Sequence, residues 1–316
     1  MKHILILAGG GGHTGFAFAL AQRLQNDVSL SFLIPEGDQL SQKRLTKFGK
    51  VDHMPKPRGA KTPISEFPYN LARAFAVSMK KVSRDFNVIV STGSNFCVPP
   101  ALVAFLKGIP LVNLESEARF IGASKTARIL QPFATITALQ WFEQKKFLKG
   151  IVVGPLFPKP ELTPWNGGYI LVTGGTLGYK HLFDVLNESN LTNIVMQTGE
   201  VDPEPYRKRH PEWKVMDFSL RFNELIAGAD VIVTHQGSTP LEALVYKKPS
   251  VIIPNPELKH TFPKRDSEIF AKKLGATFLS EFTLEKLIDA IGKSKKNKTP
   301  VFRDGAKVLA DIIINL

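Results

Sequence analysis

The sequence has very little cysteine and no long apolar run. Cys97 is the single cysteine among 316 residues, so no internal disulfide can form, and no Cys and His cluster offers metal-ligand spacing. No stretch of about 20 apolar residues exists, which excludes a membrane-spanning helix. The apolar run at residues 4–8 is shorter than the core of a signal peptide. We therefore expect a protein of the reducing cytoplasm that is not integral to a membrane.

Acidic residues are scarce relative to basic ones. The chain has 28 Asp and Glu against 41 Lys and Arg, a net charge of +13. This surplus favours a polyanionic neighbour, for which nucleic acid, anionic lipid headgroups and diphosphate substrates are the candidates; a merely solvated basic surface is the alternative. Because the chain has no helix-turn-helix, zinc-knuckle or RNP-like aromatic pattern, we expect no nucleic-acid partner.

Short β-rich runs alternate with helical stretches in both halves of the chain. This alternation is typical of parallel strands joined by helical crossovers, so we predict an α/β fold of two Rossmann-like halves. The expected strands cover 2–8, 29–34, 87–91, 110–114 and 135–137, then 169–173, 193–197, 214–215, 230–234 and 250–254. Helices are expected over 13–25, 65–84, 98–107 and 121–131, with a last one within 301–313.

A proline-rich segment separates the halves. Residues 155–168 contain four prolines and a Gly pair, which exclude a regular helix and are typical of a stiff linker. We predict a first Rossmann-like domain over 1–155, a linker over 156–168, a second Rossmann-like domain over 169–300, and a helix over 301–316 that returns to the first domain.

The first expected strand is followed by GGGGHTG at residues 9–15. Gly10, Gly12 and Gly15 match the G-x-G-x-x-G pattern, and Glu36 stands where a ribose-binding acid is expected, so an NAD-dependent dehydrogenase is one alternative. A run of four glycines fits many templates, however. Consecutive glycines at a helix N-terminus also let backbone N–H groups approach any anion closely.

His13 lies at the entrance of the first helix, a position that the dehydrogenase pattern does not explain. A histidine with a near-neutral pKa can take a proton from an attacking hydroxyl. The alternative is a histidine that only caps or packs the helix end. Glu115 follows the strand 111–114, at the carboxyl end where α/β sites lie. We favour His13 as the catalytic base, with Glu115 as its partner or substitute.

The second half opens in the same way, with ILVTGGTLG at residues 170–178. Gly174, Gly175 and Thr176 form a second candidate anion site, and two such sites suit a donor diphosphate and a phosphorylated acceptor. Further on, the turn HQGST at 235–239 can offer the Gly237 and Ser238 amides to a phosphate.

Glu242 follows about one turn into the next expected helix. There it can accept hydrogen bonds from both hydroxyls of a ribose. The alternative is a carboxylate placed favourably near a helix N-terminus.

At these motifs the sequence resembles a known family of glycosyltransferases. The first half resembles the acceptor subunit, and the second half the donor subunit, of the eukaryotic enzyme that adds the second GlcNAc to dolichol-diphosphate-GlcNAc. The whole is similar, more distantly, to the bacterial GlcNAc transferase that makes lipid II. The motifs are GGGGHT at 9–14, STGSNFCVP at 91–99, LVNLESEAR at 111–119, TALQWFEQKK at 137–146, VTGGT at 172–176, VMQTGE at 195–200 and ADVIVTHQGSTPLEAL at 229–244.

The resemblance implies a GT-B glycosyltransferase with a central cleft between two Rossmann-like domains, a fusion of both subunits, and an archaeal or bacterial source. The implied reaction is inverting transfer of GlcNAc from UDP-GlcNAc to a polyprenyl (dolichyl) diphosphate-linked GlcNAc, giving a β-1,4 bond for N-glycosylation. It also implies sets of ligand-binding residues. The donor set is Gly174, Gly175, Thr176, Gln197, His235, Gly237, Ser238 and Glu242, and the acceptor set is Gly11, Gly12, Thr14, Ser94, Asn95 and Arg119.

Alternatives remain at this point. The Gln/Asn-rich donor-sugar segment of the bacterial relative is replaced by KHTFPKRDSE at 259–268, so another UDP-sugar, such as glucuronic acid for surface polysaccharide, is a possible donor. A UDP-GlcNAc 2-epimerase shares the two-domain design. The absence of a DxD-type pair in a glycine loop favours a reaction without metal or cofactor, with helix dipoles stabilising the leaving diphosphate.

The segment 67–86 combines apolar residues with a basic margin. An apolar helix face with such a margin binds an anionic membrane interface, which predicts a protein peripheral on the cytoplasmic face of the cell membrane, as monomer or homodimer. The alternative is an ordinary helix whose apolar face joins the core. The residues concerned are Phe67, Tyr69, Leu71, Phe75, Val77 and Met79, with Arg73, Lys80, Lys81 and Arg84.

Overall fold

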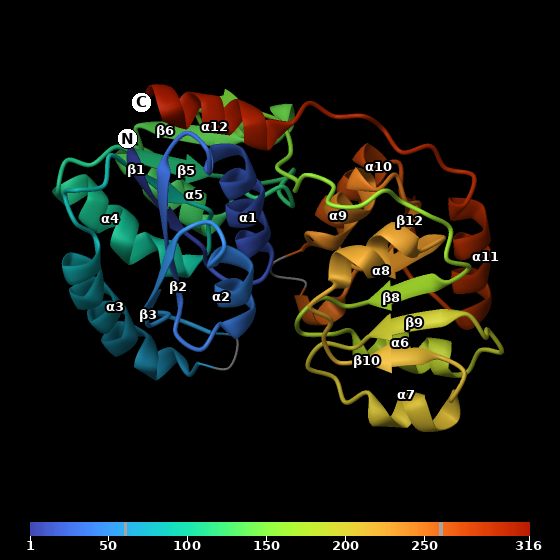
Figure 1. Ribbon diagram of the computed structural model, residues 1–316. Helices are drawn as coiled ribbons and strands as arrows, with labels where there is room; N and C mark the ends of the chain where they lie inside the picture. The colour runs from blue at the N-terminus through green and yellow to red at the C-terminus, as the bar shows by residue number, and fades with distance from the viewer. Residues whose placement is uncertain (60–61, 259–261) are drawn as a thin grey trace. The chain divides into compact units, whose positions relative to one another are not determined.

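The computed structural model describes residues 1–59, 62–258 and 262–316 (Figure 1). The chain forms two compact units: unit 1 comprises Met1–Pro158 and Phe302–Leu316, and unit 2 comprises Lys159–Val301. Within the described residues, no helix has the length and apolar character needed to cross a bilayer.

Unit 1 is a seven-stranded parallel sheet with strand order β3-β2-β1-β4-β5-β6-β7. Its strands are β1 (His3–Leu7), β2 (Ser29–Pro35), β3 (Lys50–Met54), β4 (Val88–Ser91), β5 (Leu111–Leu114), β6 (Ile136–Leu139) and β7 (Ile151–Val152). Its α-helices are α1 (Gly12–Leu24), α2 (Gln39–Leu45), α3 (Phe67–Lys81), α4 (Val98–Leu106), α5 (Lys125–Leu130) and α12 (Gly305–Asn315). Short 3-10 turns cover Ile64–Glu66, Asn95–Cys97, Gln131–Phe133 and Phe142–Lys146.

Unit 2 is a six-stranded parallel sheet with strand order β10-β9-β8-β11-β12-β13. Its strands are β8 (Ile170–Thr173), β9 (Ile194–Gln197), β10 (Lys214–Met216), β11 (Val231–Thr234), β12 (Ser250–Ile252) and β13 (Thr277–Phe278). Its helices are α6 (Lys180–Asn187), α7 (Glu204–Arg209), α8 (Phe222–Gly228), α9 (Thr239–Val245), α10 (Lys264–Lys273) and α11 (Leu284–Ser294), with a 3-10 turn at Pro256–Leu258.

Both units have the doubly wound order of a Rossmann sheet, which confirms the predicted α/β architecture. In each, the chain starts in the middle, winds outward to one edge, and then crosses back to build the other edge. The order therefore reverses between β1 and β4 in unit 1, and between β8 and β11 in unit 2. Ligands of doubly wound sheets bind outside the carboxyl ends of the strands at such reversals.

Helices on both faces of each sheet explain the continuous apolar strand sequences. Successive side chains of β1 point to opposite faces. Ile4 and Ile6 join a core with α1, α2 and α12, whereas Leu5 and Leu7 join a core with α3, α4 and α5. All four side chains are almost fully buried, so β1 is the centre of unit 1.

The elements differ from the sequence predictions mainly at their ends. The helix expected over 65–84 is a 3-10 turn followed by α3, the helix expected over 121–131 shortens to α5, and the last helix begins at Gly305. Strands β3, β7 and β13 were not expected. The segment from Lys159 to Gly168, predicted as linker, belongs to unit 2, where Trp165 and Gly167 donate backbone hydrogen bonds to Ala227 and Gly228.

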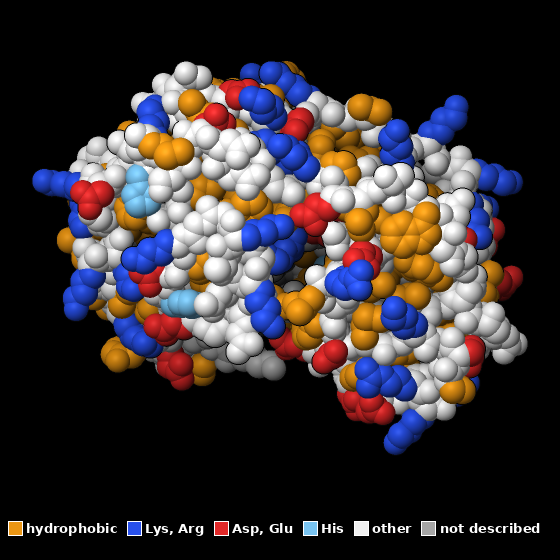
Figure 2. Space-filling model, in the orientation of Figure 1, with side chains coloured by type: hydrophobic (Ala, Val, Ile, Leu, Met, Phe, Trp, Pro, Cys, Tyr) orange, Lys and Arg blue, Asp and Glu red, His pale blue; other side chains and the backbone are white. Residues whose placement is uncertain are grey.

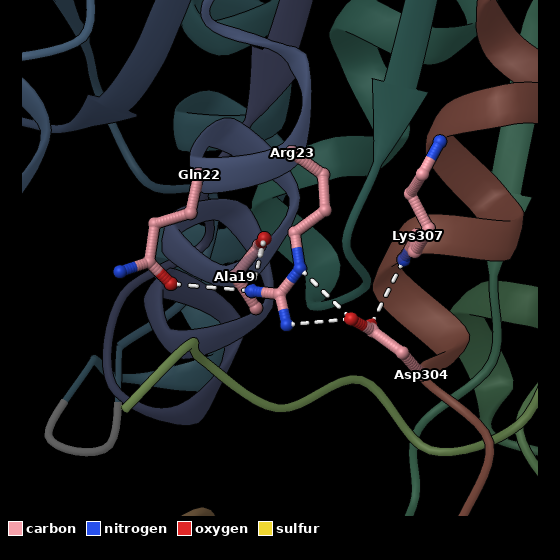
Figure 3. Close-up of polar contacts among 5 residues, drawn as sticks. All are labelled: Ala19, Gln22, Arg23, Asp304 and Lys307. Carbon is pink, nitrogen blue, oxygen red and sulfur yellow. Dashed lines mark hydrogen bonds and ion pairs between the residues drawn. The ribbon is translucent and has the colours of Figure 1, made fainter. Parts of the chain in front are cut away.

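The C-terminal helix α12 packs on α1 and is fixed by an ion pair (Figure 3). The Arg23 guanidinium, whose side chain is 2% exposed, donates to the Asp304 carboxylate from Nε at 3.2 Å and from Nη2 at 2.9 Å. Asp304 is also the N-cap of α12 and accepts from the Lys307 backbone N–H at 2.9 Å. One carboxylate therefore satisfies a buried cation on α1 and an unpaired donor of α12.

We predict that Asp304→Ala destabilises unit 1 by about 2–4 kcal/mol, because the substitution removes a helix cap and leaves the Arg23 charge buried and unpaired. Urea unfolding of the full chain, followed by tryptophan fluorescence and far-UV circular dichroism, measures this. The control is Asp311→Ala, which removes an exposed α12 carboxylate paired with Lys307 and is expected to change the unfolding midpoint little. Equal effects of both variants would contradict this role of Asp304.

Candidate functional site

Two loops meet at the strand reversal of unit 1. The glycine turn after β1 has left-handed backbone at Gly10 (φ 85°) and Gly11 (φ 57°), which glycine adopts without strain. A Cβ placed on Gly9 would lie 2.6 Å from the Ser94 Cβ in the loop after β4. A Cβ on Gly11 would meet no atom within 4 Å. The turn thus packs tightly on its neighbour at Gly9 and faces open space at Gly11.

His13 joins these two loops. It lies in the first turn of α1, and its Nδ1 is 2.7 Å from the backbone carbonyl of Thr92, after β4. Since a carbonyl can only accept, Nδ1 carries the proton and Nε2 carries the lone pair. Burial is the main cause that lowers the pKa of His13 below 6.5. The neutral imidazole therefore has its lone pair on Nε2, for which the described residues provide no hydrogen-bond partner.

Gly93 makes room for this ring. Its backbone has φ 98°, and a Cβ there would lie 2.9 Å from the His13 Cε1 atom and 3.0 Å from Nδ1. The STGSN segment therefore needs glycine at this position for both its backbone conformation and the space beside the imidazole.

Glu115 and Glu117 lie in the loop after β5, and both are buried. Glu115 accepts hydrogen bonds from the backbone N–H groups of Ser116 at 2.6 Å and Ser124 at 2.8 Å. The His13 ring is oriented by Thr92, and no hydrogen bond joins His13 to Glu115 among the described residues. A role of Glu115 as partner of His13 or as alternative base stays a prediction. Burial raises the pKa of Glu115 despite these donors.

Glu117 is more strongly perturbed, and sequence reasoning did not single it out. Burial, with a further contribution from the nearby Glu115, raises the pKa of Glu117 to about 7. Its Oε2 accepts from the Ser116 hydroxyl at 3.0 Å. The ESEAR segment thus carries two carboxyl groups whose pKa burial raises, to about 7 in the case of Glu117.

The other acceptor-set residues have distinct environments. Thr14 is buried, and its hydroxyl is 2.6 Å from the Ser41 hydroxyl of α2, so its side chain joins two helices instead of facing a ligand. Ser94 has φ 75° and caps the 3-10 turn after it. Asn95 donates to the Arg58 carbonyl at 3.0 Å, while its buried Oδ1 has no partner within the described residues. Arg119 is half-buried at the end of the ESEAR segment.

Lys56, which sequence reasoning missed, also reaches the glycine turn. It follows β3, and its ammonium donates to the Gly9 carbonyl at 3.3 Å. Desolvation is the main cause that lowers the pKa of Lys56. Lys56 could not be assigned to the site from the sequence, because the strand before it was not recognised. That strand, β3, is a short, half-buried edge strand whose sequence, KVDHM, has no apolar run.

Unit 2 repeats the arrangement at its own strand reversal. The turn after β8 is closed by glycines: a Cβ on Gly174 would lie 2.3 Å from the Gly178 carbonyl carbon, and one on Gly178 would lie 2.3 Å from the Thr198 carbonyl oxygen. His235, after β11, reaches the Gly174 carbonyl with Nε2 at 2.8 Å. As in unit 1, a histidine from one loop contacts a carbonyl of the loop across the reversal.

The remaining donor-set residues line the carboxyl ends of β8, β9 and β11. Thr176 is exposed, and Gly175 has left-handed backbone with φ 66°. Gln197 is buried and accepts from the Ser219 backbone N–H at 3.0 Å. Gly237 and Ser238 precede α9, and Glu242 is half-buried in its first turn.

The two histidines differ in the chemistry they allow. His235 has a carbonyl oxygen beside each ring nitrogen, from Gln236 at 2.5 Å and from Gly174 at 2.8 Å, and burial lowers its pKa. In contrast, His13 has a hydrogen-bond partner at Nδ1 alone within the described residues. Unit 1 can therefore supply a base, whereas His235 stabilises the glycine turn of unit 2.

Glu36, the ribose-binding acid of the dehydrogenase alternative, is exposed and forms an ion pair with Arg73 at 3.3 Å. In the described part of the chain, no three His, Cys, Asp or Glu side chains cluster in a way that could hold a metal ion.

Comparison with known protein families divides the chain near the boundary between the two units. Residues 4–155 match the model of the Alg14-like oligosaccharide biosynthesis proteins, and residues 169–311 match the glycosyltransferase family 28 C-terminal domain. A curated relative in Salinibacter ruber, UDP-N-acetylglucosamine–N-acetylmuramyl-(pentapeptide) pyrophosphoryl-undecaprenol N-acetylglucosamine transferase, is 25% identical over 93% of this chain and 89% of its own length.

Solved structures share the fold. MurG of Acinetobacter baumannii superimposes with a TM-score of 0.68 at 19% identity and full coverage of both chains. A putative UDP-N-acetylglucosamine 2-epimerase of Listeria monocytogenes gives a TM-score of 0.69 at 12% identity, covering 99% of this chain and 95% of the other. The two Rossmann-like units thus have the fold of GT-B glycosyltransferases, as predicted.

We predict that Glu117→Gln stabilises the chain more at pH 8 than at pH 5. The folded-state pKa of Glu117, about 7, lies above the unfolded value of 4.5. The neutral form is therefore favoured by folding, and stability is lost as the pH rises from the unfolded to the folded pKa. The gain reaches roughly 3 kcal/mol at most above pH 7. Thermal melts of wild type and variant across this range measure it, and a pH-independent difference would contradict the assignment.

Proposed function

We propose that this chain, which joins an Alg14-like domain to a glycosyltransferase family 28 C-terminal domain, transfers N-acetylglucosamine from UDP-GlcNAc to a lipid-linked diphosphate acceptor. The observation that carries the proposal is His13, a half-buried neutral imidazole with its lone pair on Nε2 beside a glycine turn. The Salinibacter relative, an N-acetylglucosamine transferase of a pyrophosphoryl-undecaprenol substrate, supports the same reaction class.

In this mechanism the acceptor diphosphate binds the glycine turn of unit 1. The Nε2 atom of His13 removes the proton of the acceptor hydroxyl as its oxygen attacks the anomeric carbon of the donor. The bond between that carbon and the UDP oxygen breaks, and UDP leaves with the electron pair. Direct displacement inverts the anomeric configuration. The Thr92 carbonyl stabilises the imidazolium that forms, because it accepts from Nδ1 throughout.

Unit 2 binds the donor in this proposal. Backbone N–H groups of the turns at 174–178 and 235–238 stabilise the diphosphate, and Glu242 accepts from the ribose hydroxyls. His235 maintains this arrangement by its contact with the Gly174 carbonyl. Helix dipoles and N–H groups here do the work that a metal ion does elsewhere, so we expect transfer to proceed in the presence of a chelator.

The resemblance at the sequence motifs is the basis for a more specific proposal of the acceptor and the linkage. We infer a polyprenyl diphosphate-linked GlcNAc of the dolichol type as acceptor, a β-1,4 product and a place in N-glycan precursor synthesis. A different donor such as UDP-glucuronic acid is the alternative within the same chemistry. Residues 259–268 stand where the bacterial relative has its donor-sugar segment, and residues 259–261 lie outside the described part of the chain.

A UDP-GlcNAc 2-epimerase is the second candidate, because solved epimerases share this fold. The two activities separate cleanly. An epimerase converts UDP-GlcNAc without any acceptor, whereas the proposed transferase moves labelled sugar into the organic phase only when a lipid acceptor is present.

A membrane surface is the second proposed partner. On α3, Phe75 and Val77 pack against the core, but Tyr69 is 72% exposed, and on the adjacent α4 Leu106 is 64% exposed. Lys80, in the last turn of α3, and Arg84, just after its end, are exposed. Figure 2 shows hydrophobic and basic side chains mixed over the α3 region, with some acidic ones among them. We propose peripheral binding to the cytoplasmic face of the cell membrane through this surface.

We predict that His13→Asn lowers kcat by about 10²–10⁴-fold, the usual contribution of a general base. The asparagine amide can still donate to the Thr92 carbonyl, so folding and the KM for UDP-GlcNAc should change little. The control is His3→Asn, at the opposite end of β1. Because burial lowers the pKa of His13, the wild-type rate should hold as pH falls through 6.5 and decline only below it. Near-normal transfer by His13→Asn would remove His13 from the mechanism.

We predict that Tyr69→Ser with Leu106→Ser weakens binding to anionic vesicles by about tenfold per residue, because each loses apolar area that the interface buries. Sedimentation with vesicles of phosphatidylglycerol and phosphatidylcholine measures this. The matched control is Leu220→Ser, which removes a side chain of unit 2 that is 71% exposed. An equal loss with the control, or no vesicle binding by the wild type, would refute this surface.

A further inference from the structure

The proposed mechanism leaves one cation at the glycine turn of unit 1 without a role. Lys56 follows β3, and its loop is held against the loop after β4 because Asn95 donates to the Arg58 carbonyl at 3.0 Å. The ammonium donates to the Gly9 carbonyl at 3.3 Å. Loops after β1, β3 and β4 therefore bring a lysine, a glycine turn and His13 to one edge of the sheet.

The ammonium of Lys56 is incompletely satisfied by the protein. Although the side chain as a whole is exposed, its charged end is desolvated enough to lower the pKa of the lysine. An ammonium has three protons to donate, and within the described residues the Gly9 carbonyl is its hydrogen-bond acceptor. A ligand with negatively charged oxygens would supply the missing acceptors.

The neighbouring acidic groups leave donors of Lys56 without an acceptor. Asp38 attracts the ammonium, but its carboxylate accepts from the Ser41 backbone N–H at 3.0 Å and from the Ser41 hydroxyl at 2.6 Å. Within the described residues it forms no hydrogen bond with Lys56. Cys97 is buried, and burial raises the pKa of its thiol to about 12, so it is uncharged at neutral pH. The Lys56 ammonium therefore has donors left for a ligand beside a turn that faces open space at Gly11.

We propose that Lys56 binds the diphosphate of the lipid-linked acceptor, together with the backbone N–H groups of the glycine turn. This inference rests on the proposed function and adds a residue and a role to it. A diphosphate offers several charged oxygens, so it can accept from the lysine and from the turn at once.

A second consequence concerns His13. An anionic acceptor near a buried imidazole favours the protonated ring, which cannot act as a base. Lys56 is already among the groups that lower the pKa of His13. Binding the diphosphate through Lys56 therefore keeps the positive charge on the lysine and leaves His13 neutral for proton removal.

The test is steady-state transfer from UDP-GlcNAc to two short-chain polyprenyl acceptors that carry GlcNAc, one through a diphosphate and one through a monophosphate. For Lys56→Met we expect the KM of the diphosphate acceptor to rise about 10–100-fold, the effect of losing one hydrogen bond between charged groups. The KM of UDP-GlcNAc should not change. The preference for diphosphate over monophosphate should fall, and Lys56→Arg should restore part of it.

The matched control is Lys43→Met, which removes an exposed charge from α2 in the same unit. A Lys56→Met enzyme that keeps the wild-type acceptor KM and diphosphate preference overturns the inference, as does an equal loss with both acceptors, which indicates a structural role. Failure of the proposed function gives a different result, namely no transfer by the wild type to either acceptor.

Discussion

The contact between the loops after β1 and β4 is the constraint on which the candidate site depends. It includes a hydrogen bond from His13 Nδ1 to the Thr92 carbonyl, and it depends on Gly9 and Gly93, where a side chain would collide with Ser94 and with the His13 ring. The same contact fixes three properties at once: the place of the imidazole at the strand reversal, its tautomer, and its burial. The lowered pKa of His13 follows from that burial.

The two units show how one topology supports different chemistry. Each has a glycine turn after its first strand and a histidine that reaches across the reversal of strand order. In unit 2 both ring nitrogens of His235 lie against carbonyl oxygens, so neither nitrogen is open to a substrate. In unit 1 the Nε2 atom of His13 has no hydrogen-bond partner among the described residues. In the proposed mechanism, this difference is the reason why unit 1 supplies the base and unit 2 binds the donor diphosphate.

The sequence predicted the strands of the sheet centres well, because strands covered by helices on both faces are continuous apolar runs bounded by glycine. Edge strands such as β3 were missed since they are short and half-buried. Lys56 was missed for the same reason, because a lysine in a loop can be placed at the edge of a sheet only when the strand before it is known. The role of Thr14 also could not be read from the motif, since its contact with Ser41 depends on how α1 and α2 pack. Its neighbour His13 could be proposed from the sequence, because an ionisable side chain directly after a glycine turn is a candidate for proton transfer whatever the packing of the helices.

The most direct test of the central claim is the ¹⁵N NMR titration of the histidine rings, with His13 assigned through the His13→Asn variant. The account predicts that at pH 7 the His13 ring is neutral, with the proton on Nδ1 and none on Nε2, and that its pKa lies below 6.5. A proton on Nε2 at neutral pH, or a pKa above 6.5, would contradict it.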